Sequence, residues 1–91
     1  MPTMRIPTPL RAYTGGQREL ELQGHTVGTV LENLEEQFPA LKPHIFTEQG
    51  ALRPFVNIFL GEENINDLQG AETPLKDDDR LLIIPSIAGG R

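Results

Sequence analysis

The chain has 91 residues, a formal net charge of −5 and no cysteine. This length predicts one small domain, which removes only about 60% of its unfolded surface from water, so a deep catalytic cleft is not expected. The negative charge argues against nucleic acid or an anionic membrane as a partner. The lack of cysteine excludes disulfides and thiol nucleophiles, and together with the absence of a long apolar run it predicts a soluble, cytoplasmic protein.

The first 22 residues predict a β-hairpin. A first strand is expected over residues 5–12, whose two prolines are tolerated only at an edge or a bulge. Residues 14–17, Thr-Gly-Gly-Gln, predict a turn, because glycine reaches positive φ without steric cost. Residues 18–22 follow as a second strand, in which Leu20 and Leu22 share one face.

A helix is predicted next. Thr26 is a suitable N-cap, and Pro39 is expected to end the helix because the residue before a proline avoids the α region. Five apolar residues recur at the spacing of one helix face: Val27, Val30, Leu31, Leu34 and Phe38.

The second half of the chain predicts short elements and two further strands. Residues 41–53 read as a loop with a helical turn, residues 55–60 alternate as a strand, and residues 81–84 form the last apolar run. One helix with four or five strands predicts an α+β fold, in which a mixed sheet packs one face on the helix. This element order is that of the β-grasp, or ubiquitin-like, fold, and other small α+β folds share it.

The chain ends in SIAGGR, residues 86–91. Because glycine has no Cβ, Gly89 and Gly90 can carry a terminal carboxylate through a channel too narrow for other residues. ATP can convert such a carboxylate to an acyl adenylate, from which a sulfur nucleophile displaces AMP and leaves a thiocarboxylate. The alternative is that the segment is only an unstructured end.

Four stretches of the sequence together resemble the ubiquitin-like sulfur carriers. This family includes the small subunit of molybdopterin synthase, the thiamin sulfur carrier and the thiocarboxylate carrier of a cysteine route. The chain is most similar to the last of these, because of its proline-rich first strand, its TGGQ turn and its FVN strand. The matching stretches are residues 6–17, 25–39, 55–65 and 77–90.

The resemblance implies a β-grasp domain over residues 1–88 and a flexible, reactive tail over residues 89–91. Gly90 would carry the thiocarboxylate, while Gly89 and Ala88 would thread the partner's active site. Arg91 departs from the family pattern, because it holds the terminal carboxylate one residue too far out. It is either a processing residue, a cloning remnant or an engineered block.

The same resemblance implies which residues face a partner. Residues 81–84 alternate between two faces, and the family pattern places Leu81 and Ile83 in the core. An apolar strip of Phe59, Leu82 and Ile84 would then dock the partner on the other face. For Leu82 a minor core beneath short loops is an equal alternative, whereas Ile84 favours docking.

The resemblance also implies the partners. The chain is expected not to be an enzyme and to bind no cofactor and no metal. An E1-like adenylating enzyme would use ATP on Gly90, and a pyridoxal-phosphate-dependent cysteine synthase would accept the sulfur. A metallopeptidase would remove Arg91. Two alternatives stay open, the small subunit of molybdopterin synthase and a ubiquitin-like protein modifier. The first-hairpin cations Arg5, Arg11 and Arg18 are given no role.

Overall fold

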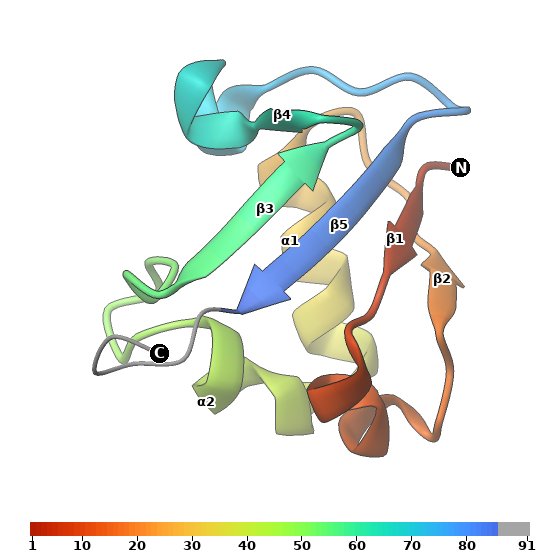
Figure 1. Cartoon of the computed structure of the whole chain (residues 1–91), viewed down its shortest axis with the longest axis vertical. Coiled ribbons are helices and arrows are strands. Elements are labelled where there is room, and N and C mark those ends of the chain that lie inside the picture. The colour runs from red at the N-terminus through yellow and green to blue at the C-terminus, as the bar shows by residue number, and fades with distance from the viewer. Residues whose placement is uncertain (86–91) are drawn as a thin grey trace.

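The computed structural model describes residues 1–85, which form five strands and one main helix (Figure 1). The strands are β1 (Thr3–Arg5), β2 (Glu19–Glu21), β3 (Val56–Leu60), β4 (Glu63–Asn64) and β5 (Arg80–Pro85). The α-helices are α1 (Val27–Gln37) and α2 (Lys42–Ile45). Four short 3₁₀ helices complete the described elements: η1 (Thr8–Thr14), η2 (Pro39–Leu41), η3 (Ile65–Asp67) and η4 (Gly70–Glu72).

The five strands form one mixed sheet in the order β2-β1-β5-β3-β4. The first and last strands, β1 and β5, run parallel at its centre, and the other neighbouring strands are antiparallel. β5 is therefore the central strand of the five, and it is also the last described element of the chain. The predicted α+β fold, with a mixed sheet on one main helix, is confirmed.

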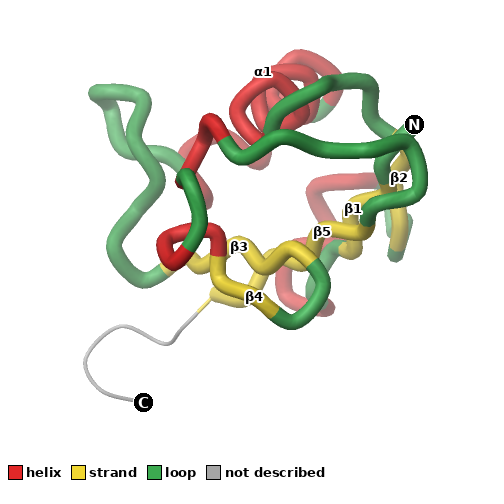
Figure 2. The backbone as a smooth tube through the Cα atoms, turned by 90° about the horizontal axis from the view of Figure 1, so that it is seen from above, coloured by secondary structure: helices red, strands yellow, loops and turns green. Residues whose placement is uncertain are grey.

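The sheet buries one face against α1, which crosses behind β5 and β3 (Figures 1 and 2). Leu81 and Ile83 point to this side and are 1% and 0% exposed, as predicted. They join apolar residues from β1, β3 and α1 in one continuous core, among them Met4, Ile58, Val30 and Leu34. No described helix covers the opposite side of the sheet, here called the outer face (Figure 1).

Helix α1 begins and ends where the sequence predicts. The Thr26 hydroxyl accepts a hydrogen bond from the Thr29 N–H at 3.2 Å, which satisfies one of the free donors of the first turn. Phe38 caps the other end, where its N–H donates to the Leu34 carbonyl, and Pro39 then begins η2. Four predicted core residues of the helix are buried and Phe38 is half-buried.

The first strand differs from the prediction. Strand β1 ends at Arg5, and Thr8–Thr14 form the 3₁₀ helix η1 instead of continuing in the sheet. The cause is proline, which lacks the N–H needed for strand pairing but is compatible with the first turn of a helix. Pro7 caps η1 in an extended conformation, and its carbonyl accepts from the Leu10 N–H at 3.0 Å.

The turn before β2 and the loop that follows α1 lie where the sequence predicts them. Gly15 and Gly16 have φ values of 68° and 84°, so the predicted glycine turn is present, and it joins η1 to β2. The predicted loop with a helical turn, residues 41–53, contains the short helix α2. Within residues 1–85, no helix is both long enough and apolar enough to span a bilayer.

Candidate docking site on the outer face of the sheet

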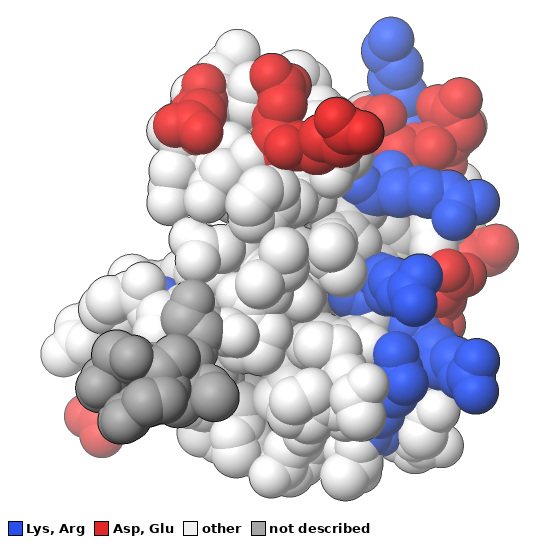
Figure 3. All heavy atoms as spheres, viewed as in Figure 1, with Lys and Arg blue, Asp and Glu red and all other residues white. Residues whose placement is uncertain are grey.

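Three apolar side chains gather on the outer face of β3 and β5. Because successive residues of a strand point to opposite faces, Leu82 and Ile84 point away from the core that Leu81 and Ile83 fill. Phe59 is the cross-strand partner of Leu82. Ile84 is 37% exposed, whereas Phe59 and Leu82 are half-buried. These three residues are named here the apolar strip, and Figure 3 shows that the centre of the same view of the molecule carries no charged side chain.

The apolar strip leads to the last residues that the structure describes. Ile84 is paired with Asn57, and the next residue, Pro85, is paired with Val56 and is the last one described. The predicted tail residues Ala88, Gly89, Gly90 and Arg91 lie outside the described residues, and so does the predicted boundary between residues 88 and 89.

Hydrogen bonds hold the strands that carry the strip. The Asn64 side-chain amide donates to Asn57 Oδ1 at 3.2 Å and so links β4 to β3. The Gly61 N–H donates to the Arg80 carbonyl at 3.0 Å, which joins the turn after β3 to the start of β5. The strip is therefore built on paired strands, which position side chains better than loops do.

Two arginines border the strip on the β1 side. Arg5 is paired with Leu82 across the parallel β1/β5 ladder, and Arg80 precedes Leu82 by two residues on the same face. Both side chains line a hollow of about 220 Å³. In the part of the chain that the structure describes, neither arginine has a carboxylate oxygen within 4.0 Å. Arg5 and Arg80 are named here the basic flank.

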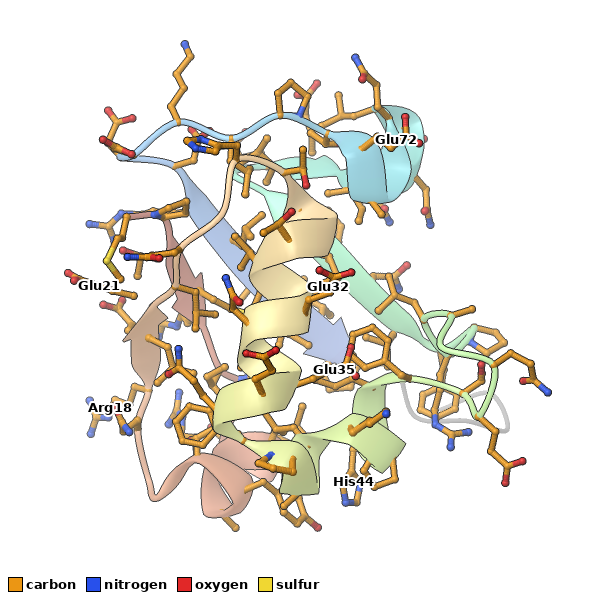
Figure 4. All side chains as sticks on the ribbon, turned by 180° about the vertical axis from the view of Figure 1, so that it is seen from behind. Arg18, Glu21, Glu32, Glu35, His44 and Glu72 are labelled. Carbon is orange, nitrogen blue, oxygen red and sulfur yellow. The ribbon has the colours of Figure 1, made fainter. Side chains whose placement is uncertain are left out.

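Of the three first-hairpin cations, which were given no role from the sequence, only Arg5 belongs to the basic flank. Arg11 donates from Nε to the Ile6 carbonyl at 3.0 Å, so it serves the local fold. Arg18 precedes β2 and points away from the molecule at its edge (Figure 4). Sequence reasoning missed Arg80, although period-two alternation along β5 places it on the same face as Leu82.

Acidic side chains lie on the rear of the molecule and along the borders of the outer face, where Glu19 and Glu21 of β2 share the face of Arg5 (Figure 3). Glu32 and Glu35 project from α1 behind the sheet (Figure 4). Figure 3 shows acidic atoms near β4 and at the far edge beyond the basic side chains. The Lys42 ammonium lies 3.8 Å from the Glu35 carboxylate, so part of the rear charge is paired. The outer face thus presents an apolar centre with cations on one flank.

Three consecutive aspartates, residues 77–79, form a turn before β5. The carboxylate of Asp79 accepts from the Lys76 N–H at 2.8 Å, while the Asp79 N–H donates to the Lys76 carbonyl at 3.1 Å. Asp77 and Asp78 are exposed. Among residues 1–85, no group of three or more histidine, aspartate or glutamate side chains could hold a metal ion.

Comparison with known proteins decides the family. The model of the ThiS family matches residues 4–90. The chain belongs to the ThiS family. It is 36% identical over 90 residues to the sulfur carrier protein CysO of Mycobacterium tuberculosis, and the match covers 97% of each chain.

Two solved structures of similar proteins extend this finding from sequence to fold. CysO in the Amycolatopsis orientalis BexX/CysO complex superposes with a TM-score of 0.87 at 34% identity, over 99% of this chain and all of the other. The small archaeal modifier protein 1 of Methanosarcina acetivorans gives a TM-score of 0.85 at 37% identity, over 98% and 95% of the two chains.

These comparisons confirm the predicted family and the β-grasp fold. The whole-chain relatives of this ThiS-family chain are sulfur carriers and ubiquitin-like modifiers, which are not themselves catalysts. The prediction that the chain is not an enzyme is therefore confirmed, and the similarity to sulfur carriers supports a carrier role. The CysO of A. orientalis is seen in a complex with a second protein, BexX.

Proposed function

We propose that this protein is a sulfur carrier whose C-terminal Gly90 carboxylate is adenylated and then converted to a thiocarboxylate. The observation that carries the proposal is the 36% identity to a CysO sulfur carrier over 97% of both chains. The family match extends to residue 90, so it includes both tail glycines and excludes Arg91.

The chemistry requires little from the chain itself. The Gly90 carboxylate attacks the α-phosphorus of ATP and forms an acyl adenylate, with release of pyrophosphate. A sulfide-equivalent nucleophile then adds to the acyl carbon, and AMP leaves with its electron pair to give the thiocarboxylate. An E1-like adenylating enzyme binds the ATP, and this chain supplies the carboxylate and the docking surface. Gly89 and Ala88 pass through the narrow channel that leads to that active site.

Arg91 must be removed before this reaction. With Arg91 in place, the terminal carboxylate lies one residue beyond Gly90 and next to a long cationic side chain. A peptidase that cleaves the Gly90–Arg91 bond would expose the reactive carboxylate, and a metallopeptidase suits this hydrolysis because a bound metal can activate water. Arg91 is then a processing residue.

We further propose that the sulfur serves cysteine biosynthesis. A pyridoxal-phosphate-dependent synthase would join the thiocarboxylate sulfur to the side-chain carbon of an activated serine, and a peptidase would release cysteine from the carrier. The support is the similarity to CysO proteins from two organisms, M. tuberculosis and A. orientalis.

A second candidate function is protein modification. The M. acetivorans small archaeal modifier protein 1 matches nearly the whole chain at 37% identity. In that role the activated Gly90 would form an isopeptide bond with a lysine amine instead of accepting sulfur. Antibody detection of the chain in lysates of its own cells separates the two roles, because a modifier gives a ladder of heavier conjugates and a carrier does not.

The proposed chemistry is tested with three purified forms of the chain, ending at Gly89, Gly90 and Arg91. Each is incubated with the organism's E1-like enzyme and ATP, and pyrophosphate release is measured. We expect release only with the form ending at Gly90. Equal release with all three forms, or none with any, would contradict the proposal.

A further inference from the structure

The basic flank is a local exception to the charge of the molecule. The chain has a formal net charge of −5, yet Arg5 and Arg80 are exposed on the outer face without a carboxylate oxygen within 4.0 Å among the described residues. Glu19 is the cross-strand partner of Arg5 and lines the same hollow, but it is not close enough to form an ion pair. Both guanidinium groups therefore remain available to another molecule.

The basic flank and the apolar strip form one continuous surface. Leu82 is the cross-strand partner of both Arg5 and Phe59, so the row across three strands runs from a cation to two apolar side chains. Leu82 also lines the hollow with Arg5 and Arg80. A partner that covers the strip must therefore meet the two arginines at its edge.

We propose that the outer face docks on a protein surface with an apolar centre and carboxylates along one side. The apolar strip contacts the centre, and Arg5 and Arg80 face the carboxylates. This inference rests on the proposed function and deepens it, because it specifies the chemistry of the surface that the adenylating enzyme presents. Arginine suits the task because its planar guanidinium binds a carboxylate through two parallel hydrogen bonds.

Protein carboxylates fit this surface better than a phosphate does. The adjoining apolar strip requires an apolar counterpart, which a free nucleotide or a nucleic-acid backbone does not supply. The net negative charge of the chain also disfavours nucleic acid.

The charge distribution also selects the docking orientation. An acidic partner surface is attracted to the basic flank and repelled by Glu32 and Glu35 on the rear of α1 (Figures 3 and 4). The approach that places carboxylates against Arg5 and Arg80 also brings the end of β5, at Ile84 and Pro85, beside the partner.

The test compares two double charge reversals in the form ending at Gly90. R5E/R80E reverses the basic flank, whereas R18E/K76E makes the same net charge change at exposed positions that do not line the hollow. The dissociation constant for the organism's E1-like enzyme is measured at low and at physiological salt. We expect R5E/R80E to weaken binding about tenfold or more at low salt and to flatten its salt dependence. The control should change binding by less than about twofold, and R5K/R80K should retain more affinity than R5E/R80E.

Each outcome is distinguishable. Normal adenylation of the unchanged chain with equal affinity loss for the two double variants would overturn the inference and leave the proposed function standing. Failure of the enzyme to bind or adenylate the unchanged chain would overturn both. Binding of ATP or inorganic pyrophosphate to the isolated chain, lost in R5E/R80E, would show that the hollow holds a free anion and would also overturn the inference. Circular dichroism confirms that each variant is folded.

Discussion

Phe59 and Leu82 face each other across the antiparallel β3/β5 ladder on the outer face of the sheet. The adjacent pair in the same ladder, Ile58 and Ile83, points the other way and is buried under α1. Two neighbouring strands thus carry a core face and an exposed apolar face. The exposed face continues along β5 to Ile84, one residue before the described chain ends at Pro85.

Replacing Ile84 with glutamate should weaken partner binding without unfolding the domain. Ile84 is 37% exposed, so a charged side chain can remain in water in the free protein. In the complex the carboxylate would be buried against an apolar surface, and we expect the affinity for the E1-like enzyme to fall about tenfold or more.

The control for this variant is Ala40→Glu, which changes an exposed apolar residue in η2, away from the strands. Titration calorimetry measures both affinities. Equal affinities for I84E, A40E and the unchanged chain would show that the apolar strip does not dock this partner.

Adjacent residues of β5 should differ sharply in their effect on stability. Ile83→Ala removes buried methyl groups and should lower the free energy of unfolding by about 3 kcal/mol. Ile84→Ala removes a similar volume from an exposed position and should cost less than about 0.5 kcal/mol. Denaturant unfolding of both variants measures the difference, and similar losses would contradict the assignment of the two faces.

The N-cap of α1 should contribute measurably to the stability of the domain. Thr26→Ala removes the oxygen that accepts from the Thr29 N–H, and we expect a loss of about 1 kcal/mol in the free energy of unfolding. Thr26→Ser keeps that acceptor and should restore most of the stability. If the alanine and serine variants unfold at the same denaturant concentration, the hydrogen bond does not stabilise the helix.

Deleting residues 89–91 should abolish activation and leave the fold intact. The residues of the described core lie between Met4 and Ile83 in the sequence, and the deletion removes none of them. We expect unchanged thermal unfolding together with complete loss of ATP-dependent pyrophosphate release. Residual activation of the shortened chain would show that Gly90 is not the reactive residue.

Local periodicity predicted those parts of the fold that depend on neighbours in the sequence. Alternation in residues 81–84 separated the two faces of the last strand, and the three-and-four spacing found α1 with its cap at Thr26. The prediction of a first strand over residues 5–12 was wrong beyond Arg5. Pro7 has no N–H for strand pairing, and the 3₁₀ helix η1 follows it instead.

The sheet order and the basic flank could not be predicted in the same way. The parallel pairing of β1 with β5 joins residues more than seventy positions apart, and no local pattern encodes it. The same pairing brings Arg5 beside Leu82 and near Arg80, so the flank exists only in the folded chain. In the sequence, Arg5 was grouped with Arg11 and Arg18, which the fold places elsewhere.

The most direct test of the central claim is the intact mass of the protein isolated from its own cells. Sulfur carriage by Gly90 predicts a species that ends at Gly90 and has gained the mass of one sulfur in place of one oxygen. It also predicts that alkylation of the thiocarboxylate removes this species and yields a single labelled product. A native mass that always retains Arg91 and never gains sulfur would contradict the account.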